Sequence, residues 1–185
     1  MRLLNKIKYA DDDTISLGRL FLIRIPSLLL GLILGLFLAF VVSEFRAVLE
    51  KDVEVAYFIP LVVYMAAAVG SQTQNIYTRD LLSGRASFKT YMLKESALGV
   101  LLGLIFSLLA GVAIHLWLNS IQLTMSVFLG MFGAIMSAPI VSLVVADVLE
   151  LEHSDPAVGA GPIATVIQDT VSVLIYGLVC SAVFL

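Results

Sequence analysis

The sequence predicts an all-α, multi-pass membrane protein with five transmembrane helices. Of its 185 residues 60% are hydrophobic, and the mean hydropathy is +1.03. Such values are typical of membrane proteins and not of soluble domains. Charged residues gather between apolar segments that are long enough to cross a bilayer, which takes about 20 residues. We interpret residues 1–20 as a cytosolic leader and residues 21–185 as one transmembrane domain.

The first four helices are predicted from the gaps between charges. Pro26 fits the first turn of the first helix, where a missing N–H costs nothing. No Lys, Arg, Asp or Glu occurs from Ser96 to Ala146, which is too long for one crossing, and Leu118-Asn119-Ser120 offers a break. The predicted spans are about Ile25–Ser43, Val55–Tyr77, Ser96–Trp117 and Gln122–Ala146.

The fifth helix is predicted from Pro156 to the carboxyl terminus, and it carries a carboxylate, Asp169, near its middle. An aspartate in mid-membrane costs about 2.5–3.5 kcal/mol on insertion scales and indicates a functional site. Its neighbours at helical spacing are also polar, so one face of the helix carries Thr165, Asp169, Ser172 and Tyr176. This face is predicted to meet a partner helix or water, and either cation binding or a structural hydrogen bond between helices would account for Asp169. Pro162, with Gly159 and Gly161, predicts an irregular start to this helix.

The distribution of Lys and Arg predicts the orientation. Nine basic residues lie in the segment before the first span and in the connection between the second and third, whereas two lie between the first and second. Positive loops stay in the cytoplasm, so the amino terminus is expected inside and, with five spans, the carboxyl terminus outside. The nine are Arg2, Lys6, Lys8, Arg19, Arg24, Arg79, Arg85, Lys89 and Lys94, and the two are Arg46 and Lys51.

Two polar segments border these spans on the cytoplasmic side. The connection DVLELEHSD has four carboxylates (Asp147, Glu150, Glu152 and Asp155) and no Lys or Arg. Such a cluster would concentrate cations at a pore mouth, although a solvated acidic loop is the simpler interpretation for Glu150 and Glu152. Asp155 precedes Pro156 and could cap a helix as well as bind a cation. Near the end of the second span, Gly70 allows close backbone approach. The residues that follow it offer neutral oxygens that suit hard cations, although a polar helix end is the simpler interpretation; they are Ser71, Gln72, Thr73, Gln74 and Asn75.

Other function classes find little support in the sequence. There is no phosphate-binding glycine loop between a strand and a helix, no nucleophile with a base, and no basic patch for nucleic acid. The single cysteine, Cys180, lies in the last apolar segment and is interpreted as a small buried hydrophobe. We therefore expect a membrane protein that is not an enzyme.

Three motifs together resemble the transmembrane domain of the MgtE family of magnesium channels and transporters. They are RIPSLLLGLILG (Arg24–Gly35), GSQTQNIYTRDLLSG (Gly70–Gly84) and DPAVGAGPIATVIQD (Asp155–Asp169). Lys94-Glu95, followed by Gly99 and Gly103, is similar to a fourth family motif. The resemblance covers about residues 20–185 and does not include the family's cytosolic amino-terminal and CBS domains.

The resemblance implies a homodimer in which the second and fifth helices of both subunits line one pore. It places the pore aspartate at Asp169 and the cytoplasmic-side aspartate at Asp155, with backbone carbonyl contacts at Ala67, Gly70 and Ser172. Ala67 and Ala68 stand where the family usually has Gly and Asn, and Ser172 replaces a usual glycine. The carbonyl contacts could therefore differ from those of the family.

The expected function is permeation of divalent cations, Mg²⁺ first and Mn²⁺ or Co²⁺ as alternatives, across the plasma membrane. Two copies of Asp169 would face a hydrated ion, since Mg²⁺ usually keeps several of its waters. The lower-ranked residues of the ion pathway are Thr165, Gln72, Ser71 and Asp147. The alternatives are a cation-coupled exchanger and a membrane scaffold that transports nothing.

Overall fold

The computed structural model describes residues 13–151 and 160–185, all of which lie in helices or their connections. Five helices are long and apolar enough to cross a membrane, which confirms the all-α fold with five candidate spans. A short sixth helix, α2, follows α1 and was not predicted. The helices are α1 (Leu17–Glu44), α2 (Arg46–Lys51), α3 (Glu54–Leu82), α4 (Phe88–Leu118), α5 (Ile121–Leu151) and α6 (Ala160–Phe184).

Two predicted helix starts need correction. The helix α1 begins at Leu17, so Pro26 lies inside it and not in its first turn, and the predicted leader boundary at residue 20 falls within the helix. The helix α6 begins at Ala160, so Gly161 and Pro162 belong to a regular first turn. Proline is tolerated there because the first N–H groups of a helix have no partner within it. Pro156 and Gly159 lie outside the described residues.

The predicted break between the third and fourth spans is confirmed. Asn119 ends α4 with a φ of 51°, a left-handed conformation that Asn adopts more readily than most residues. Its N–H donates to the His115 carbonyl at 2.9 Å. The Ser120 hydroxyl then accepts the Leu123 N–H at 3.3 Å at the start of α5. Capping on both sides therefore turns the chain within two residues.

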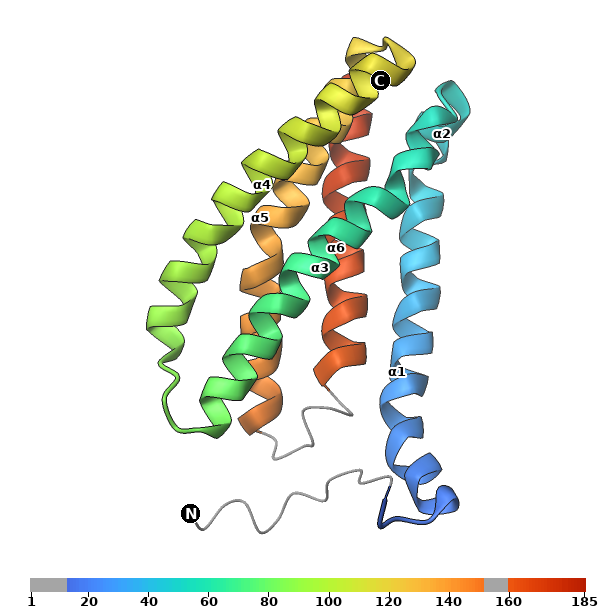
Figure 1. Cartoon of the computed structure of the whole chain (residues 1–185). Coiled ribbons are helices and arrows are strands. Elements are labelled where there is room, and N and C mark those ends of the chain that lie inside the picture. Colours follow the sequence, from blue (N-terminus) through green and yellow to red (C-terminus); the bar gives the residue numbers. More distant parts are fainter. Residues whose placement is uncertain (1–12, 152–159) are drawn as a thin grey trace.

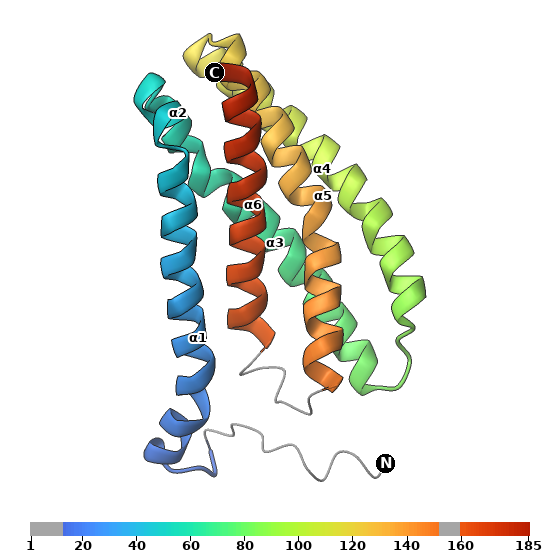
Figure 2. The same cartoon turned by 180° about the vertical axis from the view of Figure 1, so that it is seen from behind.

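The centre of the fold is α5, which packs along α3, α4 and α6 (Figure 1). Of the 18 consecutive residues that form the most apolar part of α5, half are buried, whereas 11% are buried in the corresponding part of α1. Seen from behind, α1 lies on the outside of the bundle with α6 as its main neighbour (Figure 2). Much of the apolar surface of α1 is therefore exposed in a single chain, as suits a helix in lipid or in a larger assembly.

Glycines decide how closely the helices approach one another. A Cβ at Gly99 would lie 3.0 Å from the Met136 carbonyl oxygen, so α4 and α5 pack almost backbone to backbone there. At Gly177 of α6 a Cβ would lie 2.4 Å from the ring of Phe45, which follows α1. By contrast, nothing lies within 4 Å of a Cβ at Gly31 or Gly35, on α1.

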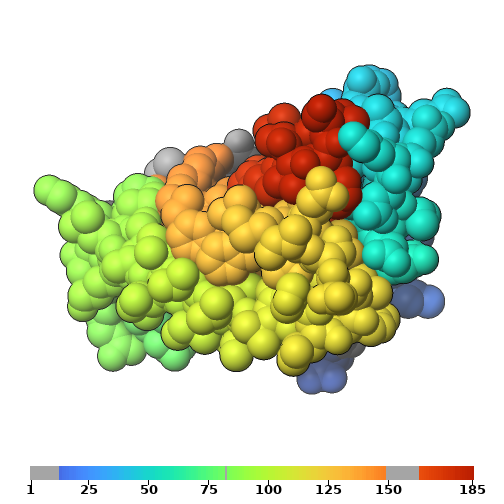
Figure 3. Space-filling view, turned by 90° about the horizontal axis from the view of Figure 1, so that it is seen from above, coloured from blue at the N-terminus to red at the C-terminus, as the bar shows by residue number. Residues whose placement is uncertain are grey.

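The two ends of the bundle differ in charge. The end with the α3–α4 connection also holds the beginning of α1 (Figure 1). Its described basic residues are Arg19, Arg24, Arg79, Arg85, Lys89 and Lys94. At the other end, α2, the α4–α5 turn and the last turn of α6 lie close together (Figure 3), and Lys51 of α2 donates to the Phe184 carbonyl. This end has only Arg46 and Lys51, so the folded chain keeps the charge asymmetry of the sequence.

Candidate cation site

Asp169 lies a little over a third of the way along α6 and is half-buried. Its Oδ1 atom is buried and has no hydrogen-bond partner among the described residues. A buried polar atom without a partner costs free energy, and the cost is larger when the group is charged. A carboxylate left in this state is ready to accept a cation or a hydrogen-bond donor that is not part of this chain.

The four residues of the polar face predicted around Asp169 differ in how deeply they are buried. Thr165 is exposed and Asp169 is half-buried, whereas Ser172 is fully buried and Tyr176 is 2% exposed. The Tyr176 hydroxyl donates to the Val55 carbonyl at 3.0 Å, so this tyrosine joins α6 to α3. Therefore only Thr165 and Asp169, the half of this polar face that is nearer the start of α6, could contact an ion outside the bundle.

A small cavity lies between α3, α5 and α6, and Gln168 lines it whereas the neighbouring Asp169 does not. We call it the Gln168 niche. Its volume is about 10 Å³, and its lining includes four of the predicted site residues, namely Ala67, Gly70, Ser71 and Thr165. The other lining residues are Gln74, Ser142, Ala164 and Gln168. The fold thus brings the polar end of α3 against the first half of α6.

Gly70 allows the close approach of α3 to α5 at this niche. A Cβ at this position would lie 2.6 Å from Ser142 Oγ and 3.5 Å from the Ala138 carbonyl oxygen. Real side chains do not come so close to their neighbours, so a larger residue would push the two helices apart. The lack of a side chain at Gly70 therefore lets α3 approach Ser142 of α5, and both residues line the cavity.

Gln168 and Ser142 are niche residues that the sequence reasoning missed. Gln168 is 2% exposed, and its amide group donates to the Ala134 carbonyl at 3.4 Å and to Ser172 Oγ at 3.1 Å. Its Oε1 atom is buried and has no partner in the described part of the chain. A glutamine within an apolar span was an available signal, because such a side chain is costly there unless it has a partner.

The remaining predicted site residues do not join this niche. Ser172 donates its hydroxyl to the Gln168 carbonyl at 2.8 Å, so its side chain lies in the α5–α6 interface. Gln72 is exposed on α3 and does not line the niche. Asp147, near the end of α5, accepts the Tyr77 hydroxyl at 2.6 Å. Asp155 lies outside the described residues, as do Glu152 and the connection around it.

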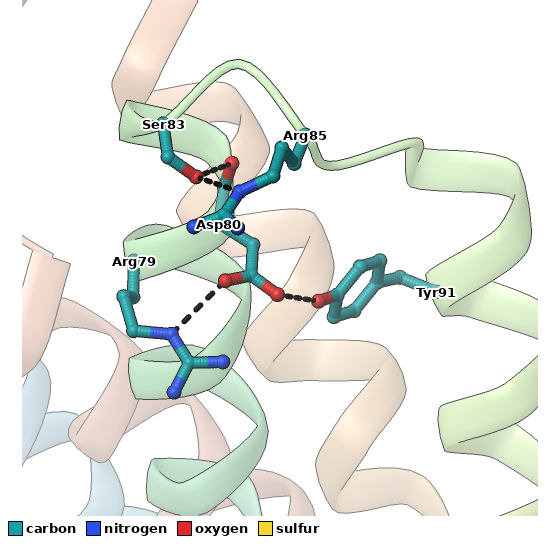
Figure 4. Close-up of polar contacts among 5 residues, drawn as sticks. All are labelled: Arg79, Asp80, Ser83, Arg85 and Tyr91. Atoms are coloured by element: carbon teal, nitrogen blue, oxygen red, sulfur yellow. Dashed lines mark hydrogen bonds and ion pairs between the residues drawn. The ribbon is translucent and has the colours of Figure 1, made fainter.

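Three other carboxylates near the α3–α4 end accept hydrogen bonds from Thr or Tyr hydroxyl groups. Besides Tyr77 on Asp147, the buried Thr73 donates to Glu95 at 2.7 Å, which joins α3 to α4. Tyr91 donates to Asp80, whose other oxygen accepts from Arg79 at 2.9 Å (Figure 4). These carboxylates hold helices together and in this respect differ from Asp169.

The chemistry available at Asp169 is that of oxygen ligands. Within the described residues of one chain, no three His, Cys, Asp or Glu side chains come together as a metal site. One carboxylate with nearby hydroxyl, amide and backbone oxygens suits a hard cation that keeps most of its water. An intramembrane carboxylate beside neutral oxygens, in a five-span bundle, is typical of membrane proteins that move cations.

Comparison with known proteins assigns this membrane protein to a family. Residues 59–179, well over half of the chain, match the MgtE family model, which is described as a divalent cation transporter. The chain therefore belongs to the MgtE family, which confirms the resemblance seen in its motifs. The match includes Asp169, the niche residues, all of α4 and α5, and most of α3 and α6.

Three curated relatives are magnesium transporters named MgtE. Those of Bacillus subtilis and Enterococcus faecalis are each 27% identical over 156 residues, which is 83% of this chain and 35% and 34% of theirs. The relative from Thermus thermophilus is 24% identical over 160 residues, covering 85% of this chain and 35% of its own length. The chain thus spans about a third of the length of the curated relatives that it matches.

Proposed function

We propose that the protein carries Mg²⁺ across the membrane through a homodimeric pore, with Asp169 as the residue that binds the hydrated ion. The observation that carries this proposal is the buried Oδ1 atom of Asp169, which has no hydrogen-bond donor among the described residues. A structural aspartate between helices would be expected to have such a donor, as Asp147 and Glu95 do.

Membership in a family of divalent cation transporters supports the choice of substrate. Mg²⁺ gives up its water reluctantly and is usually bound through one or two carboxylates, with several waters retained. In the described part of one chain, Asp169 is the one carboxylate with a buried oxygen that lacks a hydrogen-bond partner. A second copy related by a two-fold axis would supply the second, which is our reason for proposing a homodimer.

The proposed pore is lined by α3 and α6, the second and fifth spans of each subunit. Support comes from the niche, where α3 and α6 place Ser71 and Thr165 at one exposed rim. The charge asymmetry of the ends supports a cytoplasmic α3–α4 end, because basic residues are retained on that side. Asp155 is proposed as the carboxylate on the cytoplasmic side of the pore, and the plasma membrane as the location.

The test is Mg²⁺ uptake into liposomes that contain the purified protein or its Asp169→Asn variant. A hydrogen bond to a charged group contributes about 1.5–3 kcal/mol, and the dimer loses two carboxylates, so uptake should fall about a hundredfold or more. The matched control is Glu50→Gln, which removes one charge from an exposed ion pair with Arg46 and should leave uptake unchanged.

Two outcomes would contradict parts of the proposal. Normal uptake by a folded Asp169→Asn variant would exclude the pore role of this residue, and no uptake by the native protein would favour a scaffold. A Mg²⁺ flux that stops without a gradient of a second cation would show an exchanger. The same liposomes tested with Mn²⁺ and Co²⁺ would measure the selectivity among divalent ions.

A further inference from the structure

The exposed face of α3 carries hydroxyl and amide groups along its length. Tyr57, Tyr64, Ser71 and Asn75 are all exposed, and they follow one another at spacings of seven, seven and four residues, close to whole helical turns. The buried residues of this helix are mostly apolar. Because lipid offers no partners for polar groups, we expect the exposed face to meet water or a second protein chain.

Tyr64 lies too deep in α3 for a tyrosine at the membrane surface. It is ten residues from Glu54, the first residue of the helix, which is about 15 Å along the helix axis. The hydrocarbon core is about 30 Å thick, so a belt of aromatic residues at the surface accounts for Tyr57, in the first turn, but not for Tyr64.

The hydroxyl group of Tyr64 also lacks a partner. The residue is 68% exposed, and its hydroxyl makes no hydrogen bond within the described part of the chain. By contrast, Tyr176 donates to the Val55 carbonyl and Tyr77 donates to Asp147. A hydroxyl that faced hydrocarbon at this depth without a partner would be unfavourable, so the side chain of Tyr64 is better explained if it faces water.

Tyr64 shares its direction with Ser71, two helical turns away. Seven residues turn a helix by nearly two full turns, so the two side chains leave α3 on the same side. Ser71 lines the Gln168 niche together with Thr165 of α6, and Asp169 is one turn from Thr165 on that helix. The side of α3 that carries Tyr64 is therefore the side that meets the Asp169 half of α6.

Two contacts between α3 and α6 enclose both residues. One contact is the hydrogen bond from Tyr176 to the Val55 carbonyl, and the other is the Gln168 niche. Tyr64 lies between these contacts along α3, and Asp169 lies between them along α6. The two helices run in opposite directions, and helical side chains lean toward the N-terminus of their helix. Tyr64 therefore leans toward the α2 end, and Asp169 leans toward the α3–α4 end.

We propose that Tyr64 lines the ion path on the outer side of Asp169, and that its hydroxyl oxygen accepts a hydrogen bond from the hydration shell of the cation. This inference rests on the proposed function. A divalent ion polarises its waters and makes them strong donors, and a neutral phenol can accept from them without adding charge. Such a contact orients a hydrated ion and still lets it leave.

The first experiment measures whether position 64 meets water or lipid. A Tyr64→Cys variant should react with a cationic, membrane-impermeant methanethiosulfonate, because the reactive thiolate forms only in water. The native protein is the blank, since its single cysteine, Cys180, is buried. The matched control is Leu104→Cys, at an exposed apolar position near the middle of α4, which should react at least about tenfold more slowly. Equally slow reaction at both positions would overturn the proposal.

The second experiment measures Mg²⁺ uptake into liposomes. Tyr64→Phe removes only the hydroxyl and should raise the Mg²⁺ concentration for half-maximal uptake about three- to tenfold, the value of one hydrogen bond. The matched control is Tyr57→Phe, the same exchange in the first turn of α3, where bulk water replaces the hydroxyl and uptake should not change. An unchanged Mg²⁺ dependence in Tyr64→Phe would overturn the contact with the hydration shell.

The outcomes also separate this proposal from the function on which it rests. A large loss of uptake in Asp169→Asn, with no reaction at position 64, would keep the proposed function and overturn the role of Tyr64. Normal uptake by Asp169→Asn, with rapid reaction at position 64, would reject Asp169 as the ion-binding residue but keep a water-filled path beside Tyr64.

Discussion

Two carboxylates in membrane-spanning helices, Glu95 and Asp169, have opposite surroundings. Glu95 of α4 accepts a hydrogen bond from Thr73, which is almost fully buried. Asp169 of α6 is half-buried, as Glu95 is, yet its buried oxygen receives no hydrogen bond in the described part of the chain. In the sequence both are acidic residues within or beside apolar segments. Only the fold shows that one has a hydrogen-bond donor and the other does not.

The difference indicates that a small helical bundle can contain both carboxylates with hydrogen-bond donors and a carboxylate that is left without one. A satisfied carboxylate stabilises the contact between two helices, and removing its donor leaves a buried charge without compensation. An unsatisfied carboxylate destabilises the empty protein and becomes favourable only when a ligand binds. Substitutions of the two kinds should therefore have opposite effects on stability.

The largest effect is expected for Asp169→Leu. Leucine inserts into a membrane helix more favourably than aspartate by about 3 kcal/mol, so unfolding of the variant should become harder by up to about this amount. The measurement is the thermal unfolding midpoint in detergent, followed by intrinsic fluorescence. A clear fall in this midpoint would mean that Asp169 stabilises the fold, and the distinction between the two carboxylates would be lost.

A smaller effect of opposite sign is expected for Thr73→Val. The change keeps the size and shape of the side chain and removes the hydroxyl that donates to Glu95, so unfolding should become easier by about 1–3 kcal/mol. Thr90→Val, on an exposed turn of α4, is the matched control and should change little. If Thr73→Val altered ion selectivity with no change in stability, Glu95 would belong to the ion path.

The smallest of the three effects is expected for Tyr77→Phe. The loss of the hydroxyl leaves Asp147 without this donor, but Asp147 is close to the end of α5, where water can replace it. The expected cost is about 1 kcal/mol, measured by the same unfolding assay. Because Tyr77 also packs edge-on against Tyr91, the ring must be kept, and Tyr77→Ala would test packing instead.

Much of the fold could be predicted because charged residues are rare inside membrane-spanning helices and therefore mark where these helices end. The long uncharged segment was divided correctly at Asn119, a residue that favours left-handed backbone. The start of α1 was placed too late because Arg19 and Arg24 were taken as a boundary. Helical hydrogen bonds do not depend on charge, however, and long basic side chains can extend to the membrane surface from inside a helix.

The site could be predicted only in part. Gly70, Ser71 and Thr165 of the niche were identified because glycine and hydroxyl groups are conspicuous in apolar spans, whereas Ala67 came only from the family resemblance. Gln168 and Ser142 were missed, since their role depends on which neighbouring helix they face. Spacing along one helix indicates which residues share a face, but it does not indicate whether that face meets lipid, water or another helix.

The contact between Gly177 and Phe45 links the outer end of α1 to α6, the helix that carries Asp169. Position 177 has no room for a side chain, because a Cβ there would overlap the aromatic ring at the corner between α1 and α2. Asp169 lies about two turns further down the same rigid helix, roughly 12 Å away. A single added methyl group at residue 177 would therefore force the Phe45 ring away from the helix that carries Asp169, without touching the carboxylate.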